Sequence, residues 1–178
     1  MLKKYYPYEY VENVFTIDYN KLYEKGFRGI IFDIDNTLVP HGADSTPEVD
    51  KLFIDIQKIG FKTILLSNNN EARVKRFIKN IDTMYICDAE KPKTKNFLKA
   101  VEMLDLPKNQ VVMIGDQTFT DILGANKSGI PSILVKFIGY YTENKIGIKR
   151  NIEKIILKLY TKNKSSKNRL GNIEKRCK

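Results

Sequence analysis

The chain has 178 residues, 42% of them hydrophobic and 29% charged, which is typical of one soluble globular domain with a substantial core. No apolar run approaches the roughly eighteen residues of a membrane span, and we expect no secretory signal. The single histidine, His41, excludes histidine-rich zinc sites. The two distant cysteines, Cys87 and Cys177, exclude a disulfide framework and favour a reducing cytoplasm. Residues 161–178 hold seven basic residues and one acid, so +6 of the net charge of +10 lies in this tail and +4 in the first 160 residues.

From residue 27 onward, short apolar runs alternate with segments of helical periodicity. The apolar runs predict strands over residues 29–33, 61–66, 84–87, 111–114 and 133–137. The periodic segments predict helices over residues 47–59, 71–80, 95–104, 119–128 and 148–159. Thr46 is placed as the N-cap of the first helix, and Gly60 ends it. The alternation predicts a doubly wound α/β domain with a mainly parallel sheet.

Three segments follow from this division. Residues 1–28 are expected to form an extension packed on the core, and residues 29–160 the main domain. The last helix is expected to be amphipathic because of Ile148, Ile152, Ile155, Ile156 and Leu159. Residues 161–178 are rich in Asn and Ser and poor in large apolar residues, so we expect a disordered tail. Its charge leaves open a contact with an anionic membrane or a nucleic acid.

The sequence Asp33-Ile34-Asp35-Asn36-Thr37 comes directly after the first predicted strand. Two carboxylates two residues apart repel each other, so they need either a bound cation or a proton held by one of them. A Mg²⁺ ion would meet the first need, and a raised pKa would make Asp35 a usable acid. In isolation, the pattern is also typical of a turn or a helix cap.

Polar residues follow the other predicted strands as well. Ser67 follows the second strand, Lys91 the third and Asp116 the fourth, with Asp121 five residues later. Ligands of open α/β sheets bind beyond the carboxyl ends of the strands, where these side chains would meet. Carboxylates, a hydroxyl and an ammonium together are the parts of a phosphoryl-transfer site.

Each of these groups has a physical task in such a site. A carboxylate such as that of Asp33 can attack phosphorus and form an acyl phosphate. Mg²⁺ offsets the repulsion between this carboxylate and the phosphate, and Asp33, Asp116 and a backbone carbonyl could hold it. A hydroxyl and an ammonium stabilise the negative charge as it moves among the phosphate oxygens.

Four short motifs in this order resemble those of the haloacid dehalogenase (HAD) phosphatases. They are D-I-D-N-T at 33–37, S-N-N at 67–69, K-P at 91–92 and G-D-Q-T-F-T-D at 115–121. Each motif stands at the end of a predicted strand, and the resemblance extends over residues 29–137. It implies a HAD-like fold and Mg²⁺-dependent hydrolysis of a phosphorylated substrate through an aspartyl-phosphate.

The resemblance assigns roles to the first motif. Asp33 would be the nucleophile and a Mg²⁺ ligand. Asp35 would protonate the leaving oxygen, then deprotonate the hydrolytic water, and would ligate Mg²⁺ through its backbone carbonyl. Thr37 would orient the loop around the substrate phosphate. An acid at position 35 favours a phosphoester hydrolase over family members that lack it.

The other three motifs would complete the site that the resemblance implies. Ser67 would hydrogen-bond the phosphoryl group with help from the amide of Asn68, and Lys91 would neutralise the aspartyl-phosphate. Asp116 would complete the Mg²⁺ site, and Asp121 would support it from outside the ligands.

Several of these residues have simpler interpretations. Ser67 could cap the next helix, and Asp121 could pair with a surface cation. Lys93 lies close enough in sequence to take the place of Lys91. His41 follows the first motif, where it could be an ordinary loop residue or could contact the leaving group.

The spacing between the motifs leaves no room for a cap domain over the site. Asp33 and Ser67 are 34 residues apart, and Ser67 and Lys91 are 24 apart, which the predicted helices and strands fill. We therefore expect an open site. Such a site cannot enclose a small metabolite, so its specificity would come from a phosphate presented by a macromolecule, a partner or a surface.

Within the superfamily, the chain resembles the capless YqeG-type subfamily of class IIIA. The resemblance rests on F-D-I-D-N-T-L-V at 32–39, S-N-N at 67–69 and G-D-Q-T-F-T-D at 115–121. This subfamily includes phosphatidylglycerophosphate phosphatases of mitochondria and plastids, which implies that lipid as a candidate substrate. The basic tail at 161–178 would then contact the anionic inner face of a membrane.

Two functions of other classes stay open. One is a regulatory or binding protein with a HAD fold, whose tail contacts RNA, a ribosome or a protein partner; the tail lacks the aromatic residues among basic ones that would stack on bases. The other is a phospho-accepting receiver domain. It fits less well because Ser67, Lys91 and Asp116 follow in the order of the phosphatase motifs.

Overall fold

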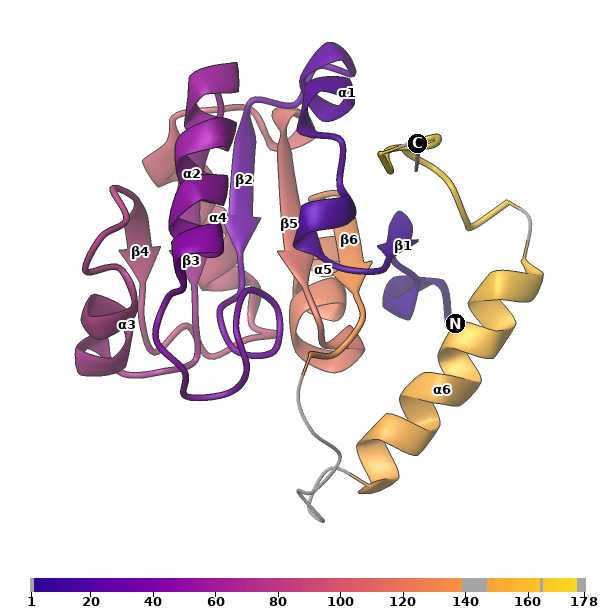
Figure 1. The fold of residues 1–178 in the computed structure, drawn as a ribbon. Helices are drawn as coiled ribbons and strands as arrows, with labels where there is room; N and C mark the ends of the chain where they lie inside the picture. Colours follow the sequence, from indigo (N-terminus) through magenta and orange to yellow (C-terminus); the bar gives the residue numbers. More distant parts are fainter. Residues whose placement is uncertain (1, 139–146, 164, 176–178) are drawn as a thin grey trace.

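A computed structural model describes residues 2–138, 147–163 and 165–175, without the side chains of residues 147–150. A six-stranded, entirely parallel sheet with the order β1-β6-β5-β2-β3-β4 forms its centre (Figure 1). The strands are β1 (Glu9–Val11), β2 (Gly29–Phe32), β3 (Lys62–Leu66), β4 (Met84–Ile86), β5 (Val111–Gly115) and β6 (Ser132–Val135). This architecture confirms the predicted doubly wound α/β class.

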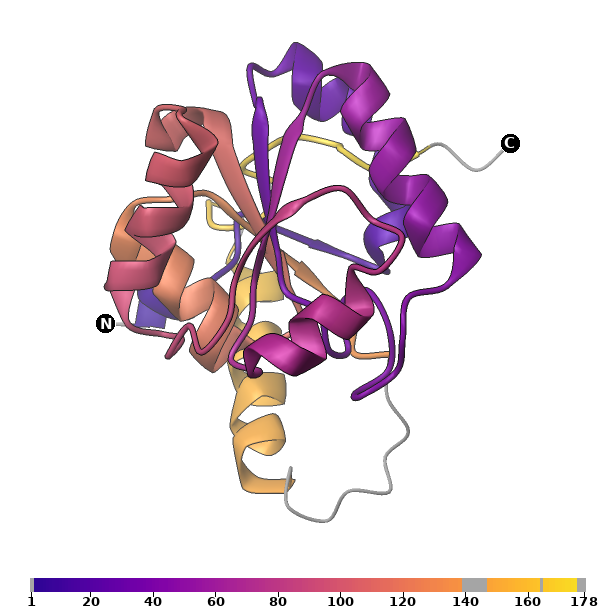
Figure 2. The ribbon, with the colours of Figure 1, turned by 90° about the vertical axis from the view of Figure 1, so that its left-hand side faces the viewer.

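Helices cover both faces of the sheet (Figure 2). The α-helices are α1 (Tyr19–Glu24), α2 (Pro47–Ile59), α3 (Glu71–Phe77), α4 (Thr94–Leu104), α5 (Leu123–Ser128) and α6 (Gly147–Lys162). Short helical turns are η1 (Leu2–Tyr5), η2 (Val14–Thr16), η3 (Lys108–Gln110) and the π-helical η4 (Thr118–Ile122). Helices α1, α2 and α3 contribute to the core on one face, and α4 and α5 to the core on the other.

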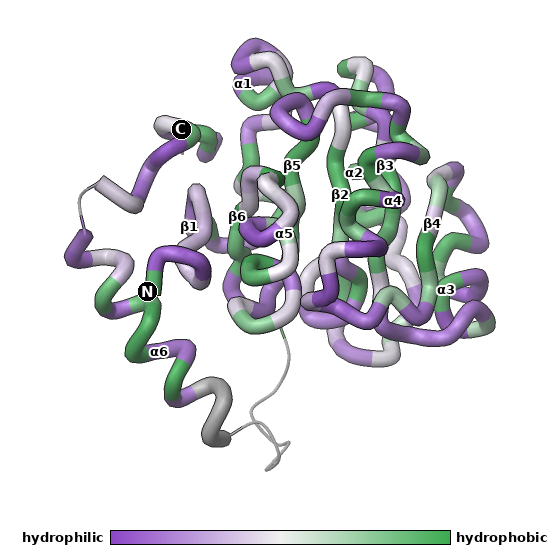
Figure 3. Tube along the Cα trace, turned by 180° about the vertical axis from the view of Figure 1, so that it is seen from behind, coloured by the Kyte–Doolittle hydropathy of each residue, from purple (hydrophilic) through white to green (hydrophobic). Residues whose placement is uncertain are grey.

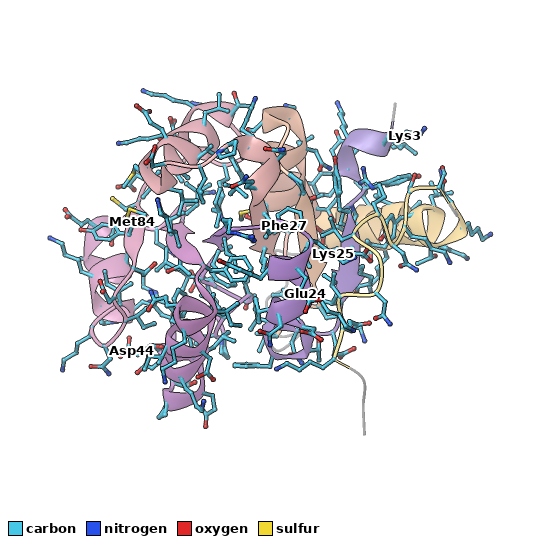
Figure 4. The ribbon with its side chains drawn as sticks, turned by 90° about the horizontal axis from the view of Figure 1, so that it is seen from above. Lys3, Glu24, Lys25, Phe27, Asp44 and Met84 are labelled. Carbon is cyan, nitrogen blue, oxygen red and sulfur yellow. The ribbon has the colours of Figure 1, made fainter. Side chains whose placement is uncertain are left out.

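The central strand β2 shows why apolar runs form this sheet. Ile30, Ile31 and Phe32 are all fully buried. Successive side chains of a strand point to opposite faces, so Ile30 and Phe32 join one core and Ile31 the other. The central strands accordingly lie in the hydrophobic colours of Figure 3. In the view from above, Phe27 lies near the centre of the molecule, whereas Asp44 lies at its periphery (Figure 4).

Local signals place the longest helix of this core where the sequence predicts it. The side chain of Thr46 accepts a hydrogen bond from the Val49 N–H, and Pro47 follows it in the first turn. Helix α2 ends at Gly60, which has a φ of 112°. Helix α3 is shorter than predicted, because it ends at Phe77 rather than at residue 80.

The N-terminal segment extends the sheet. Strand β1 pairs with β6, with Tyr10 opposite Leu134. The segment up to residue 28 thereby contributes an edge strand as well as core residues such as Val14 and Leu22. The division of the chain at residues 28 and 160 remains a prediction.

The C-terminal segment differs from the expected disordered tail. Residues 165–175 pack on the N-terminal segment: the Ile173 carbonyl accepts a hydrogen bond from the Asp18 N–H at 2.6 Å, and Arg169 lies over the ring of Tyr8 at 3.6 Å. Ile173 itself is 1% exposed. The prediction of disorder was wrong for these residues because an average composition hides one well-placed apolar anchor. Residues 164 and 176–178, and with them Cys177, lie outside the described residues.

Helix α6 lies beside β1 at the edge of the molecule (Figure 1). Ile156 and Tyr160 are buried against Tyr6, with Tyr6 and Tyr160 in edge-to-face contact. The predicted amphipathic helix therefore exists, but its buried face is offset from the expected one: Ile152, Ile155 and Leu159 are exposed. The side chain of Ile148 is outside the described part. None of the described helices combines the length and the apolar character needed to cross a bilayer.

Replacement of Ile173 tests whether the C-terminal segment is part of the fold. We expect Ile173→Ala to lower the free energy of unfolding by about 2–5 kcal/mol, because it leaves a cavity in the core. Urea denaturation measures the change. Ile54→Ala on α2 is the control, since Ile54 is 49% exposed and should have little effect. Equal stability of the two variants would show that residues 165–175 are not packed as described.

Candidate active site

The carboxyl ends of the central strands bring together the side chains that the sequence singles out. Strand β2 lies between β3 and β5, so the chain leaves it in one direction and returns on its other side. Ligand sites of doubly wound sheets form at this switch point. Here Asp33 follows β2, Ser67 follows β3 and Asp116 follows β5. Oxygen atoms of Asp33, Asp116 and Asp121 lie within 4.8 Å of one another.

Asp33 lies at the floor of the site. Its Oδ1 is 2.5 Å from Lys91 Nζ, and its Oδ2 is 3.1 Å from the hydroxyl of Thr37. Thr37 is fully buried and also lies 3.4 Å from Asp116 Oδ1, so one hydroxyl can donate to either carboxylate. Burial raises the pKa of Asp33 to about 6, although the Lys91 charge opposes this increase.

Lys91 is the ammonium at the centre of the carboxylates. Its Nζ bridges Asp33 Oδ1 and Asp121 Oδ1, at 2.5 and 2.7 Å. Burial lowers the pKa of Lys91, but the charges of Asp121 and Asp33 outweigh burial and raise it above its usual value. Lys93, the alternative, instead pairs with Glu90 at the surface. The structure therefore brings Lys91 to the site and not Lys93.

Asp121 reaches the site from the π-helical turn η4. Its Oδ2 accepts a hydrogen bond from the Gln117 N–H at 3.0 Å, while its Oδ1 holds Lys91. Gly115 makes this approach possible, because a Cβ at that position would lie 2.5 Å from the Asp121 carboxylate carbon. Asp121 is 1% exposed and pairs with a buried lysine rather than a surface cation.

The donor set fits a hard divalent cation. Asp33, Asp116 and Asp121 offer only carboxylate oxygens, the ligands that Mg²⁺, Ca²⁺ and Mn²⁺ prefer. Lys91 and the Gln117 N–H engage the two oxygens of Asp121, and Lys91 and Thr37 engage those of Asp33, so each carboxylate is held in a fixed orientation toward the cluster.

Asp35 lies above this cluster, and its side chain points to other partners. Its Oδ2 accepts a hydrogen bond from Asn69 at 2.7 Å, and its Oδ1 accepts one from the Gly42 N–H at 3.1 Å and one from Arg73 at 2.9 Å. Burial raises the pKa of Asp35, but these hydrogen bonds and the Arg73 charge together lower it below its ordinary value. The expected raised pKa thus occurs at Asp33 and not at Asp35. The reason is that Asp35 has more hydrogen-bond donors around it and is less buried.

Sequence reasoning missed Arg73 and Asn69. One Arg73 Nη2 donates both to Asp35 and to the Ala43 carbonyl at 2.7 Å, so it joins helix α3 to the loop after the first motif. Arg73 stands three residues after the helix cap Asn70, in the first turn of α3. The sequence feature that could have indicated Arg73 is its place in the first turn of a helix that begins at the carboxyl edge of the sheet.

The loop after β3 connects the second motif to the first and third. The Ser67 hydroxyl accepts hydrogen bonds from the Asn69 N–H and Nδ2, at 3.2 and 2.9 Å. Its own proton has no acceptor among the described residues and can be donated to a ligand. Asn68 Oδ1 accepts the Lys91 N–H at 2.8 Å, so Asn68 positions Lys91.

These residues surround one pocket with a buried floor and an exposed rim. The side chain of His41 is 64% exposed on this rim, and its Nδ1 lies 3.3 Å from Asp35 Oδ2. In the part of the chain that the structure describes, only α2 and β3 lie between Asp33 and Ser67, so no cap domain covers the pocket there. The lining residues are Asp33, Asp35, Asn36, His41, Ser67, Asn68, Asn69, Lys91, Gln117 and Thr120.

Comparisons with known proteins point to the same family as the four motifs. The family model described as a haloacid dehalogenase-like hydrolase matches residues 42–129. The protein named "Probable phosphatase YqeG" from Bacillus subtilis is 44% identical over 137 residues, which cover 76% of this chain and 80% of that protein.

Two other proteins match this chain at lower identity. Phosphatidylglycerophosphate phosphatase 1 of Arabidopsis thaliana is 24% identical over 73% of this chain and 40% of its own length. An uncharacterized protein from Listeria monocytogenes matches with a TM-score of 0.51 and 16% identity over 74% of this chain and 99% of that chain, which shows the fold alone. By its fold, its four motif loops and its identity to the Bacillus protein, the chain belongs to the haloacid dehalogenase-like hydrolases, as an enzyme of the phosphatase type.

Proposed function

We propose that this enzyme is a Mg²⁺-dependent phosphomonoesterase that uses Asp33 as its nucleophile. The observation that carries the proposal is the position of the Asp33 carboxylate. It lies at the floor of an open pocket, between the Lys91 ammonium and the hydroxyl of Thr37. A buried carboxylate held by an ammonium is oriented for attack on a phosphorus atom placed above it.

In the first step, an Asp33 oxygen forms a bond to phosphorus while the bond from phosphorus to the leaving oxygen breaks. The proton of Asp35 passes to the leaving oxygen. The Ser67 hydroxyl donates to a phosphoryl oxygen, and Lys91 balances the negative charge of the aspartyl-phosphate. In the second step, Asp35 takes a proton from water, the water oxygen attacks phosphorus, and inorganic phosphate leaves with the Asp33 carboxylate restored.

The metal would be held by Asp33, Asp116 and the backbone carbonyl of Asp35. When bound, Mg²⁺ supplies positive charge that offsets the repulsion between the phosphate and the carboxylates. Asp121 takes part indirectly, since it positions Lys91. Thr37 orients the loop rather than the substrate, because its hydroxyl faces two carboxylates.

The lowered pKa of Asp35 suits one of its two proposed tasks. A carboxylate held ionised by Arg73 and Asn69 is ready to act as the base of the second step. For the first step it needs a proton, and the negative charge of a bound phosphate nearby raises the pKa of a carboxyl group. We infer that substrate binding itself prepares Asp35 to act as the acid.

The substrate that we propose is a phosphomonoester on a large or membrane-bound molecule. Among the described residues, the pocket has an exposed rim and no cap domain over it, an arrangement that favours a phosphate presented by a larger molecule over an enclosed small metabolite. Phosphatidylglycerophosphate is the candidate, supported by the name of the Arabidopsis relative, of which the chain spans 40%. The corresponding place of action is the inner face of a membrane. A binding role of the C-terminal tail towards RNA has less support, because residues 165–175 engage the N-terminal segment.

Loss of the nucleophile tests the reaction. We expect Asp33→Asn to lower kcat for a soluble phosphomonoester at least about 1,000-fold, because an amide does not attack phosphorus. Phosphate release with Mg²⁺ measures the change. The melting temperature should not fall, since asparagine has the same shape. The exposed Asp55→Asn is the control, and comparable turnover in both variants would exclude Asp33 as the nucleophile.

Removal of the metal tests the cofactor. We expect excess EDTA to abolish turnover and Mg²⁺ to restore it, because the phosphate would otherwise face the carboxylates of Asp33, Asp116 and Asp121 with Lys91 as the compensating charge. Phosphate release before and after dialysis measures this dependence. Full activity in EDTA would contradict a metal-dependent mechanism.

Replacement of Arg73 tests the position of Asp35. We expect Arg73→Ala to lower kcat roughly 10- to 100-fold, because Asp35 loses the partner that orients it. Arg76→Ala is the matched control: Arg76 lies on the same helix and holds Asp44 and the Gly42 carbonyl but does not touch Asp35. Steady-state kinetics measure kcat of both variants. An equal loss of kcat in the two would show that Arg73 acts by holding the loop at residues 42–44 and not through Asp35.

A further inference from the structure

The outer face of helix α6 carries an apolar stripe that no described residue covers. Ile152, Ile155 and Leu159 are 45%, 60% and 41% exposed. Steps of three and four residues place them in one row along the helix. Single exposed apolar residues are ordinary, whereas a continuous row of them marks an interaction surface.

The other side of the helix is anchored, so the stripe cannot turn inward. Ile156 and Tyr160 are buried against Tyr6. Glu153 is only 6% exposed, and its Oε1 accepts a hydrogen bond from the Thr118 N–H at 2.6 Å. Rotation of α6 to bury the stripe would break these contacts and leave a carboxylate or a backbone N–H without its partner.

Basic residues accompany the stripe. Lys154, Lys158 and Lys162 are exposed and form a second row at four-residue spacing, directly beside the apolar row. The single acidic residue of α6, Glu153, is the one that is buried. From residue 151 to 162 the exposed surface of the helix therefore carries positive charge and apolar side chains, with no carboxylate.

The helix also lies close to the catalytic edge. In Figure 1, α6 begins at the end of the molecule where β2 and β5 finish. The hydrogen bond of Glu153 ties it to Thr118, in the loop that also carries Asp116 and Asp121. A surface bound to the outer face of α6 would thus lie beside the pocket rather than behind it.

We propose that the outer face of α6 is a docking surface for an anionic lipid bilayer. The helix lies in the plane of the interface, with Ile152, Ile155 and Leu159 inserted among the acyl chains and the lysine row against the headgroups. An apolar row next to a cationic one, on a helix of low mean hydropathy, is typical of such interfacial helices. The proposed membrane contact thus lies on α6, whose lysine row shares Lys162 with the basic segment 161–178. It rests on the proposed function only in so far as the bilayer would present the substrate.

Co-sedimentation of the full chain with vesicles tests this surface. One set of vesicles holds phosphatidylcholine alone, and the other adds phosphatidylserine, which carries no phosphomonoester and so is no substrate. We expect binding at least about tenfold tighter to the anionic set, weakening as salt is added. Ile155→Ser should weaken it about tenfold or more, through the lost burial of one apolar side chain. Lys154→Ala with Lys158→Ala should weaken it roughly 30-fold, about 1 kcal/mol for each lysine.

Matched controls come from helix α2, which also exposes an isoleucine and lysines. Ile54→Ser, and Lys51→Ala with Lys58→Ala, should leave vesicle binding unchanged. Equal binding to both vesicle sets, or equal losses in the α2 and α6 variants, would overturn the proposal. So would absent vesicle binding together with a concentration-dependent mass in light scattering that Ile155→Ser abolishes, since the face would then join two copies of the chain.

Hydrolysis of a soluble phosphomonoester, measured in the same samples, separates this proposal from the proposed function. Turnover that the α6 variants retain shows that they fold and that only docking has changed. Vesicle binding without turnover of either the soluble ester or phosphatidylglycerophosphate in the vesicles would support the docking surface and refute the phosphatase mechanism. Turnover without vesicle binding would support the phosphatase mechanism and refute the docking surface.

Discussion

Charge compensation around Lys91 is the constraint on which the carboxyl edge of the sheet depends. The carboxylates of Asp33, Asp116 and Asp121 lie within 4.8 Å of one another in a place that water hardly reaches. A single ammonium cannot balance three carboxylates. Burial raises the pKa of Asp33, and the charge of Asp121 adds to this increase while that of Lys91 opposes it. A divalent cation held by these carboxylates would supply the missing positive charge and would also offset the charge of a bound phosphate.

The parallel sheet turns four distant segments into one site. Strand β2 reverses the direction of winding, and its neighbours β3 and β5 deliver Ser67 and Asp116 to the same edge as Asp33. Small details then set the distances: Gly115 lets Asp121 approach, and Asn68 holds the backbone of Lys91. Helix α3 fixes the side chain of Asp35, because Arg73 in its first turn donates a hydrogen bond to that carboxylate.

The sequence was sufficient for the α/β class and for the position of the motif residues at the strand ends, because both follow from local rules, but it did not predict strand β1. Buried runs such as Ile30-Ile31-Phe32 predict strands, and polar residues at their ends predict where a ligand binds. Contacts between distant segments could not be predicted. The anchoring of Ile173, the reach of Arg73 to Asp35 and the offset of the buried face of α6 all depend on tertiary packing, which leaves no periodic trace in the chain.

The hydrogen bond from the Thr118 N–H to Glu153 has a consequence for how the enzyme matures. Every residue of the motif loops lies before position 122, yet the loop after β5 receives this partner from a helix that begins at residue 147. During synthesis the sheet can therefore assemble around an incompletely supported fourth motif. The loop after β5 therefore gains its full set of contacts only after the last helix has left the ribosome and docked beside the sheet.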